Sequence, residues 1–208
     1  MVHFCDDRGA CGFSWIVAEP VTRTSHALCA DGRVWLVDPV DWPDAIERAH
    51  ALGEPAGVLQ LLDRHNRDCA AVASGLGVPR LVVPTAVPES PFQVIELRRS
   101  RRWQEVALWW DARRTLVIAE AIGTNAFYTG GRAAAGVHLF MRLSPPRQQL
   151  EAFDPEHLLV GHGEGLHRDA ATASLRAALA RSRRDLPRVV RAIPPLVLDA
   201  RRRRRSPS

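Results

Sequence analysis

Short runs of β-branched, aromatic and leucine residues recur along most of the chain and predict strands. The first runs cover residues 13–17 and 33–37, and a turn signal at residues 30–32 favours an N-terminal hairpin. Further runs predict strands at residues 57–62, 80–83, 92–97, 104–110, 115–119 and 157–160. These strands alternate with helical segments, which is the order expected of an α/β domain.

Helical spacing of apolar residues predicts three helices, at residues 43–52, 67–76 and 169–185. Pro43 suits the first position of the first helix, Asn66 is a plausible cap for the second, and a glycine follows each of these two helices. The third helix has alanine and leucine on one face and arginine on the other, which predicts an amphipathic helix that covers a core.

Length and charge favour one domain with a basic tail. A chain of 208 residues with 46% hydrophobic residues can bury one substantial core, and we expect a single domain over residues 1–198. The net charge of +5 equals the charge of the run Arg201 to Arg205, so the basicity belongs to a tail at residues 199–208 that we expect to be disordered. Arginine runs bind phosphates, but this one lacks interleaved aromatic residues, so nucleic acid is an unlikely partner.

The chain opens without the basic and apolar segments of a secretory signal, and no apolar stretch reaches the ~20 residues that span a bilayer. Its four cysteines form neither a CxxC pair nor the dense spacing of a disulfide framework. We therefore expect a cytoplasmic protein with free thiols and no membrane partner. The sequence leaves the oligomeric state open.

One polar loop and one late motif carry the candidate chemistry. The loop after the strand at 57–62 reads Arg-His-Asn-Arg-Asp-Cys over residues 64–69, and the last strand runs into Gly161-His162-Gly163. Together with the order of elements over residues 12–180 and the strand end at Asp38, these motifs resemble the metallo-β-lactamase-like hydrolases. The resemblance implies a four-layer αββα sandwich of two sheets between helices. It also implies that the polar loop carries ligands for one or two metal ions, usually zinc.

The first metal site of that family is expected to be lost. Arg64 and Asn66 stand where the family has two histidine ligands, and residues 98–103 contain no histidine to supply the next one. An arginine guanidinium stays protonated and has no lone pair to donate. His65 is the alternative imidazole, but the resemblance places it at a variable position whose side chain points away from the metals.

The second site keeps residues that bind metals. Asp68 is retained, Cys69 stands where a histidine is usual, Glu120 stands where the bridging aspartate is usual, and His162 matches the Gly-His-Gly motif. Carboxylate, thiolate and imidazole are all zinc donors, and three protein ligands plus water suffice for a catalytic site. The resemblance thus implies one zinc, iron or manganese ion held by these four residues. Asp68 and Glu120 would take part in catalysis, since a bound metal lowers the pKa of water to ~7.

A second interpretation treats the four residues as remnants on a decayed scaffold that binds no metal. Glu120 would then pair with Arg64, whose charge replaces the missing cation and holds an anionic group. Arg64 and Arg67 would attract an anionic small molecule to the old pocket. Two functions remain open: a mononuclear metal-dependent hydrolase of unknown substrate, and a non-catalytic ligand-binding or interaction protein.

Other polar residues receive smaller roles. Asp38 is expected to order its loop, because carboxylates at strand ends commonly accept backbone N–H bonds. His138 and His167 are expected near the mouth of the pocket, as surface residues or as proton carriers. The strand alternation predicts that at least one of Trp109 and Trp110 lies in the core.

Overall fold

The structure is a computed structural model that describes residues 1–19 and 21–192. The arginine tail predicted at residues 199–208 and the domain boundary predicted at residue 198 lie outside the described residues. The first sheet has six strands in the order β1-β2-β3-β4-β5-β6. Its strands are β1 (Val2–Asp7), β2 (Gly12–Val17), β3 (Arg23–Ala30), β4 (Arg33–Val37), β5 (Glu54–Gln60) and β6 (Arg80–Val82).

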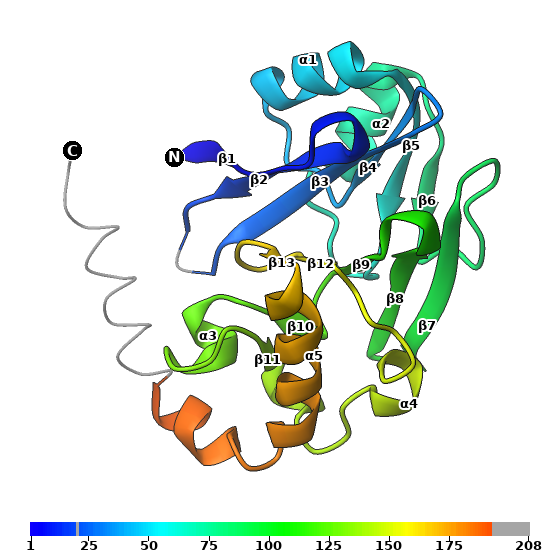
Figure 1. Ribbon diagram of the computed structural model, residues 1–208. Coiled ribbons are helices and arrows are strands. Elements are labelled where there is room, and N and C mark those ends of the chain that lie inside the picture. Colours follow the sequence, from blue (N-terminus) through cyan, green and yellow to red (C-terminus); the bar gives the residue numbers. More distant parts are fainter. Residues whose placement is uncertain (20, 193–208) are drawn as a thin grey trace.

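The first four strands of this sheet form an antiparallel meander, whereas β4, β5 and β6 are parallel. Parallel neighbours need crossover connections, and helices α1 (Pro43–Leu52) and α2 (Cys69–Leu76) provide them. Both helices lie on the same outer face of the sheet (Figure 1). The bounds of α1 match the prediction, and α2 starts two residues later than predicted because the preceding loop turns back on itself.

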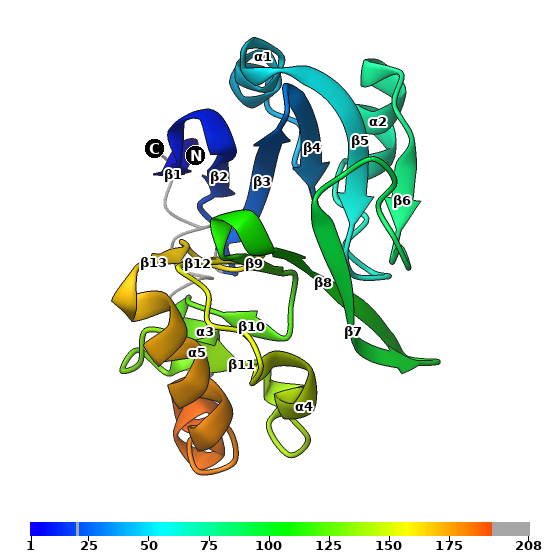
Figure 2. The ribbon, with the colours of Figure 1, turned by 45° about the vertical axis from the view of Figure 1, so that its right-hand side comes forward.

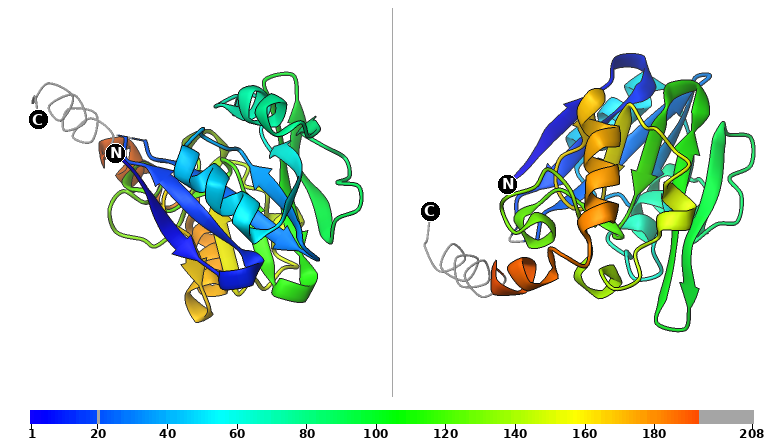
Figure 3. Two further views of the ribbon diagram at one scale, coloured as in Figure 1. Left: turned by 90° about the horizontal axis from the view of Figure 1, so that it is seen from above. Right: turned by 60° about the horizontal axis from the view of Figure 1, so that its bottom comes forward.

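The second sheet has five strands in the order β13-β12-β9-β8-β7. Strands β7, β8 and β9 are antiparallel, β9 and β12 are parallel, and α5 (Asp169–Arg181) lies on the outer face of the sheet (Figures 1 and 3). The strands are β7 (Phe92–Ser100), β8 (Trp103–Trp110), β9 (Thr115–Ile118), β12 (His157–Val160) and β13 (Leu166–His167). A small sheet and two short helices lie between β9 and β12, where no strand or helix was predicted: β10 (Ile122–Gly123), α3 (Ala126–Thr129), β11 (Gly136–Val137) and α4 (Arg147–Leu150).

The two sheets face each other, so the layers follow the order helix, sheet, sheet, helix (Figure 2). Side-chain alternation divides the apolar residues of the first sheet between two cores. Leu28 and Trp35 pack toward the second sheet, whereas their neighbours Ala27 and Leu36 pack under α1 and α2. The four-layer αββα sandwich implied by the sequence is thereby confirmed. None of the described helices is long and apolar enough to cross a membrane.

Strand β3 was not predicted, because its sequence places polar residues where a strand is fully buried. Thr24, Ser25 and His26 are at most 1% exposed. Most of their polar atoms have partners inside the protein: the Thr24 hydroxyl donates to the Gly163 carbonyl, and His26 Nδ1 meets the Ser14 hydroxyl, although His26 Nε2 has no partner among the described residues. Burial of polar groups in this way depends on neighbours far along the chain, which a local pattern does not reveal.

Candidate metal centre

Four strand ends meet at one edge of the sandwich and position the candidate site. Asp38 follows β4, and the loop of residues 61–68 follows β5, its parallel neighbour in the first sheet. Glu120 follows β9, and His162 follows β12, its parallel neighbour in the second sheet. The carboxyl ends of parallel strands lie at the same edge of their sheet, so each sheet contributes two adjacent segments.

The loop after β5 is fixed to the second sheet by β-type pairing. Leu62 forms an isolated bridge with Glu105 of β8, and the backbone N–H of Asp63 donates to the Gln104 carbonyl. The fully buried Glu105 carboxylate accepts backbone N–H bonds from Glu120 and Ala121 at 2.7 and 2.8 Å. Burial raises the pKa of Glu105 to about 7, although these bonds favour its ionised form.

His65, Glu120 and His162 form a compact buried cluster. One oxygen of the Glu120 carboxylate, Oε2, lies 2.7 Å from His65 Nε2 and 2.8 Å from His162 Nε2. The two Nε2 atoms are 3.3 Å apart. Both histidines are less than 9% exposed. Two imidazoles and one carboxylate therefore converge on a single point from three different loops.

Each histidine of the cluster is oriented through its other ring nitrogen. His65 Nδ1 lies 3.1 Å from Asp38 Oδ2, and His162 Nδ1 lies 2.7 Å from the Thr22 carbonyl oxygen. Both partners are acceptors, so each Nδ1 carries a proton and each Nε2 faces the centre of the cluster. Metal-binding histidines commonly have this second contact to a carboxylate or a backbone carbonyl. Asp38 also accepts the Leu61 backbone N–H, as expected for a loop-ordering residue.

A third histidine contacts the other oxygen of Glu120. His138 Nε2 lies 3.2 Å from Glu120 Oε1, and His138 Nδ1 accepts the Phe140 backbone N–H. That acceptor role leaves the proton on Nε2, so His138 donates to Glu120. The ring of Tyr128 stacks on His162 with centroids 5.7 Å apart, and its buried hydroxyl has no hydrogen-bond partner among the described residues.

The charges of the cluster depend on one another. Burial opposes ionisation of Glu120, but its hydrogen-bond contacts with His138, His162 and His65 outweigh burial and lower its pKa. Burial and the nearby Arg67 guanidinium lower the pKa of His65, yet Asp38 and Glu120 outweigh them, so the pKa of His65 is raised. Burial lowers the pKa of His162, because Glu120 offsets it only in part. A proton on His65 is thus held between two carboxylates.

The donor set fits a metal ion. The ligand atoms of His65, Glu120 and His162 all lie within 4.8 Å of one another. In tetrahedral zinc sites with bonds of about 2.0–2.1 Å, ligand atoms lie roughly 3.3 Å apart. The distance between the two nitrogens meets this value, and the carboxylate oxygen would need to move by about half an ångström. Two histidines and one carboxylate with an open position suit catalytic zinc and also non-haem iron.

Of the four predicted ligands, the structure brings Glu120 and His162 together and places Asp68 and Cys69 elsewhere. Asp68 Oδ2 accepts the Asp41 backbone N–H at 2.9 Å, and Asp68 precedes α2 at its N-terminal end. The Cys69 thiol is fully buried at the start of α2 and donates to the His65 carbonyl at 3.5 Å. Burial raises the pKa of this thiol to about 12, which opposes the thiolate form that binds metals.

The placement of His65 corrects the expectation that its side chain points away from the site. The expected side-chain directions assumed the loop conformation of the family motif, with ligands at the positions of Arg64 and Asn66. In this chain the loop turns through a positive φ of 38° at Arg67, and His65 takes the inward position. The sequence carried no signal for this direction, because it depends on the loop turn and on the contact with Asp38, which belongs to a different strand end.

The expected ion pair between Arg64 and Glu120 is not formed. Arg64 pairs with Asp63 at 3.3 Å, and its guanidinium lies over the Trp103 ring, 4.6 Å from the centroid. Arg67 is the arginine that lies near the cluster. Its guanidinium donates to three backbone carbonyls, those of Thr24, Asp38 and Gly161.

The two outer histidines lie at opposite ends of the sandwich. His138 lies beside the cluster, as expected of a residue near the pocket mouth. His167 pairs with His157 at the start of β12, whereas His162 follows the end of that strand. His167 is therefore a strand's length from the candidate metal centre.

Solved metallo-β-lactamase structures share this fold. The structure of DIM-1 metallo-β-lactamase exposed to ceftazidime matches with a TM-score of 0.60 and 11% sequence identity, over 87% of this chain and 96% of that chain. VMB-1 matches with a TM-score of 0.60 and 9% identity over the same shares. TMB-1 matches with a TM-score of 0.57 and 10% identity, over 88% of this chain and 97% of that chain. The chain is a protein of the metallo-β-lactamase fold. No protein-family model and no curated protein matches its sequence.

Proposed function

We propose that this protein is a mononuclear metal-dependent hydrolase whose ion is held by His65, Glu120 and His162. The observation that carries the proposal is the convergence of two Nε2 atoms and one carboxylate oxygen within 3.3 Å of one another in a buried site. Such a set leaves at least one coordination position for water or substrate. A bound ion there would lower the pKa of a water molecule to ~7 and polarise an oxygen of the bond to be cleaved.

The protein's own groups prepare this site for an ion. The Asp38 carboxylate and the Thr22 carbonyl hold the Nδ1 protons of His65 and His162, so that both Nε2 lone pairs become available once the proton shared with Glu120 leaves. Metal affinity is therefore expected to fall as the pH falls, because the proton on His65 competes with the ion.

His138 is suited to move a proton at this site. Its Nε2 donates to Glu120 Oε1, and its side chain is 19% exposed, so it connects the buried carboxylate to solvent. A histidine in such a position can accept a proton from attacking water or donate one to a leaving group. We assign it the role of proton carrier.

The test is metal-dependent turnover of a panel of esters, thioesters, lactams and phosphodiesters by the full chain. We expect activity after reconstitution with zinc, manganese or iron(II), loss on adding a chelator, and loss in Glu120→Gln. The matched control is Glu164→Gln, which alters an exposed carboxylate two residues after His162. Turnover that survives both the chelator and the Glu120 variant would refute the proposal.

A non-catalytic ligand-binding protein is the second candidate. It is favoured by the contacts of Glu120, because a carboxylate that already meets three histidines is satisfied by protein groups alone. This candidate predicts ligand binding that is indifferent to chelator and no turnover of any substrate in the panel.

A further inference from the structure

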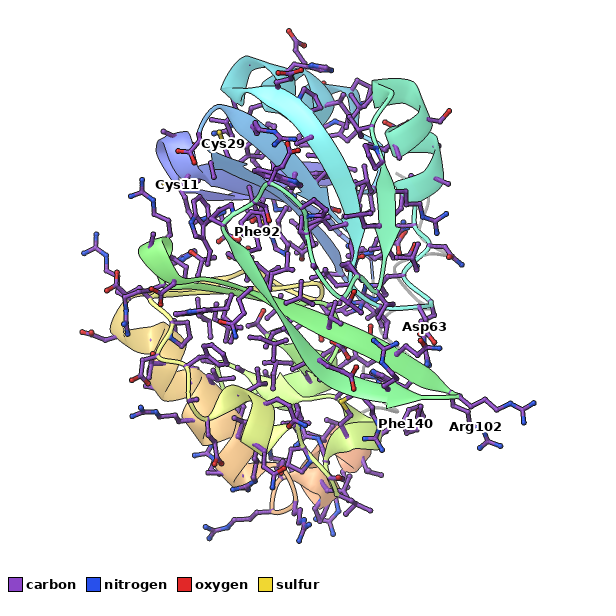
Figure 4. All side chains as sticks on the ribbon, turned by 90° about the vertical axis from the view of Figure 1, so that its right-hand side faces the viewer. Cys11, Cys29, Asp63, Phe92, Arg102 and Phe140 are labelled. Carbon is purple, nitrogen blue, oxygen red and sulfur yellow. The ribbon has the colours of Figure 1, made fainter. Side chains whose placement is uncertain are left out.

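A pocket of about 480 Å³ opens beside the candidate metal centre, under the end of the β7–β8 hairpin. Figure 4 shows Arg102 at the tip of this hairpin, with Asp63 and Phe140 close by. The pocket is lined by residues of the hairpin, of the loop after β5 and of the segment after β11, among them Arg64, Arg98, Arg102, Trp103, Phe140 and Met141. We call it the arginine pocket.

The arginine pocket is strongly basic. Three of its lining residues are arginines, and no described acidic residue lines it. Arg98 and Arg102 form no ion pair with any residue that the structure describes, whereas the adjacent Arg99 pairs with Glu96 at 2.5 Å. Arg64 is partly neutralised by Asp63, so the unpaired charge of the pocket is that of Arg98 and Arg102, from which an anion with several oxygen acceptors can accept charge-assisted hydrogen bonds.

The walls of the pocket are aromatic. Phe140 is 78% exposed, which is unusual for a large apolar residue, whereas Trp103 is 7% exposed and lies beneath the Arg64 guanidinium. An apolar group packed on the Phe140 ring would remove apolar surface from water, which stabilises binding by roughly 25 cal/mol per Å². The pocket thus offers charge and a flat apolar surface side by side.

The arginine pocket borders the metal centre through His138. The ring of His138 lies 4.9 Å from the ring of Trp103 and 5.3 Å from the ring of Phe140, both of which line the pocket, and His138 contacts Glu120. A small molecule in the pocket would therefore lie one side chain away from the cluster. This proximity distinguishes the pocket from a distant patch of charge on the surface.

We propose that the arginine pocket binds the acidic end of the substrate, an aromatic group that bears a phosphate or a carboxylate. The inference rests on the proposed function, because it names the substrate class for the same site. Arg98 and Arg102 bind the anionic oxygens, Arg64 adds its charge from above Trp103, and Phe140 covers the ring. These are binding residues, and none of them belongs to the metal cluster.

The test is isothermal titration of the full chain with phenyl phosphate, benzoate, inorganic phosphate and benzyl alcohol. We expect phenyl phosphate or benzoate to bind more tightly than inorganic phosphate, and benzyl alcohol not to bind. Arg98→Ala and Arg102→Ala should each weaken binding about five-fold or more, the loss of one charge-assisted contact. Phe140→Ala should weaken binding of the aryl probes and leave inorganic phosphate unchanged.

Arg99→Ala is the matched control, since Arg99 lies on the same strand but is paired with Glu96. Equal affinity in the Arg98, Arg102 and Arg99 variants, or no saturable binding of any charged probe, would overturn the proposal. The zinc, manganese and iron content of the same samples after reconstitution separates the two ideas. Arginine-dependent binding by protein that holds none of these metals supports the pocket and contradicts the hydrolase, whereas full metal content without probe binding contradicts the pocket alone.

Discussion

Glu120 organises the candidate centre at the scale of single residues. Its two carboxylate oxygens face three imidazoles, with Oε2 shared by His65 and His162 and Oε1 facing His138. The carboxylate is partly shielded from water, so these contacts decide its charge. His65 and His162 are oriented by acceptors outside the cluster, Asp38 and the Thr22 carbonyl. A change at one of these acceptors should therefore alter metal binding without removing a ligand.

Asp38→Asn tests this orientation. The asparagine oxygen can still accept the Leu61 N–H, but the amide nitrogen then faces His65 Nδ1 and donates to it. The proton of a neutral His65 would move to Nε2, which leaves no lone pair for an ion. We expect zinc affinity to fall by about 10- to 100-fold, as is usual for outer contacts of metal sites. Asp63→Asn in the same region is the control, and equal affinity of the two variants would contradict the assigned role of Asp38.

Asp6 provides a residue-scale prediction about pH. Burial would raise its pKa, but the hydrogen bond from His167 and nearby imidazole charges lower it to about 2, below its usual value near 3.8. A carboxyl group whose pKa is lower in the folded state than in the unfolded state stabilises the fold at pH values above its unfolded-state pKa. This contribution is lost as the pH falls through the folded-state pKa. Asp6→Asn should therefore cost about 1–2 kcal/mol in the free energy of unfolding at pH 6, and less as the pH falls from about 4 toward 2.

Urea unfolding at several pH values measures this cost, with Asp31→Asn in an exposed turn as the control. A cost that stays constant between pH 6 and pH 3 would show that the carboxylate charge is not responsible.

Single residues were predictable from the sequence where a motif carried them. His162 lies in a Gly-His-Gly motif and Glu120 follows an apolar strand, so both could be selected by position. His65 could not, because the direction of its side chain depends on the loop turn at Arg67 and on Asp38. Whether Asp68 and Cys69 contribute to metal binding likewise depends on loop geometry, which spacing alone does not determine.

At the scale of elements, β8 holds the segment that carries Glu120. Its Glu105 side chain accepts the backbone N–H groups of Glu120 and Ala121, and its other oxygen accepts the Trp103 indole N–H at 2.8 Å. Three buried donors thus depend on one side chain. The segment that carries Glu120 is held in place by an element of the same sheet rather than by its own sequence.

Glu105→Ala should leave these three donors without partners. Each buried donor left unpaired costs about 1–3 kcal/mol, so the variant should lose roughly 3 kcal/mol or more of unfolding free energy. The control is Glu96→Ala on the neighbouring strand β7, where the carboxylate is exposed and its loss should cost about 0.5 kcal/mol or less. Equal stability of the two variants, measured by urea unfolding, would contradict the role given to Glu105.

Elements were predictable where the local pattern agreed with the final packing. Pro43 and Gly53 mark the two ends of α1. The alternation of β8 predicted that at least one of Trp109 and Trp110 lies in the core, and both do, at 6% and 5% exposed. Strand β3 escaped prediction because its buried polar residues are satisfied by distant partners. The short elements between residues 121 and 150 take their shape from contacts with α5, with β7 and with the segment after β12.

At the scale of the whole molecule, the cluster joins both halves of the sandwich, since His65 belongs to the first sheet and the other two candidate ligands to the second. An ion that binds all three should hold the halves together. Zinc at 100 times its dissociation constant should stabilise the fold by about 2.7 kcal/mol, provided that the unfolded chain does not bind it. Thermal unfolding should show a higher Tm with zinc and reversal by chelator. His65→Ala should abolish the shift, and a shift that persists in this variant would indicate binding elsewhere.

The most direct test of the account is elemental metal analysis of the purified full chain and of four variants, after reconstitution and desalting. The structure predicts near-stoichiometric metal in the wild type, in Cys69→Ala and in Asp68→Asn, and loss of the metal in His65→Ala and His162→Ala. Metal that is lost in Cys69→Ala but retained in His65→Ala would contradict the cluster, and a wild-type chain that binds no metal would contradict the proposed function altogether.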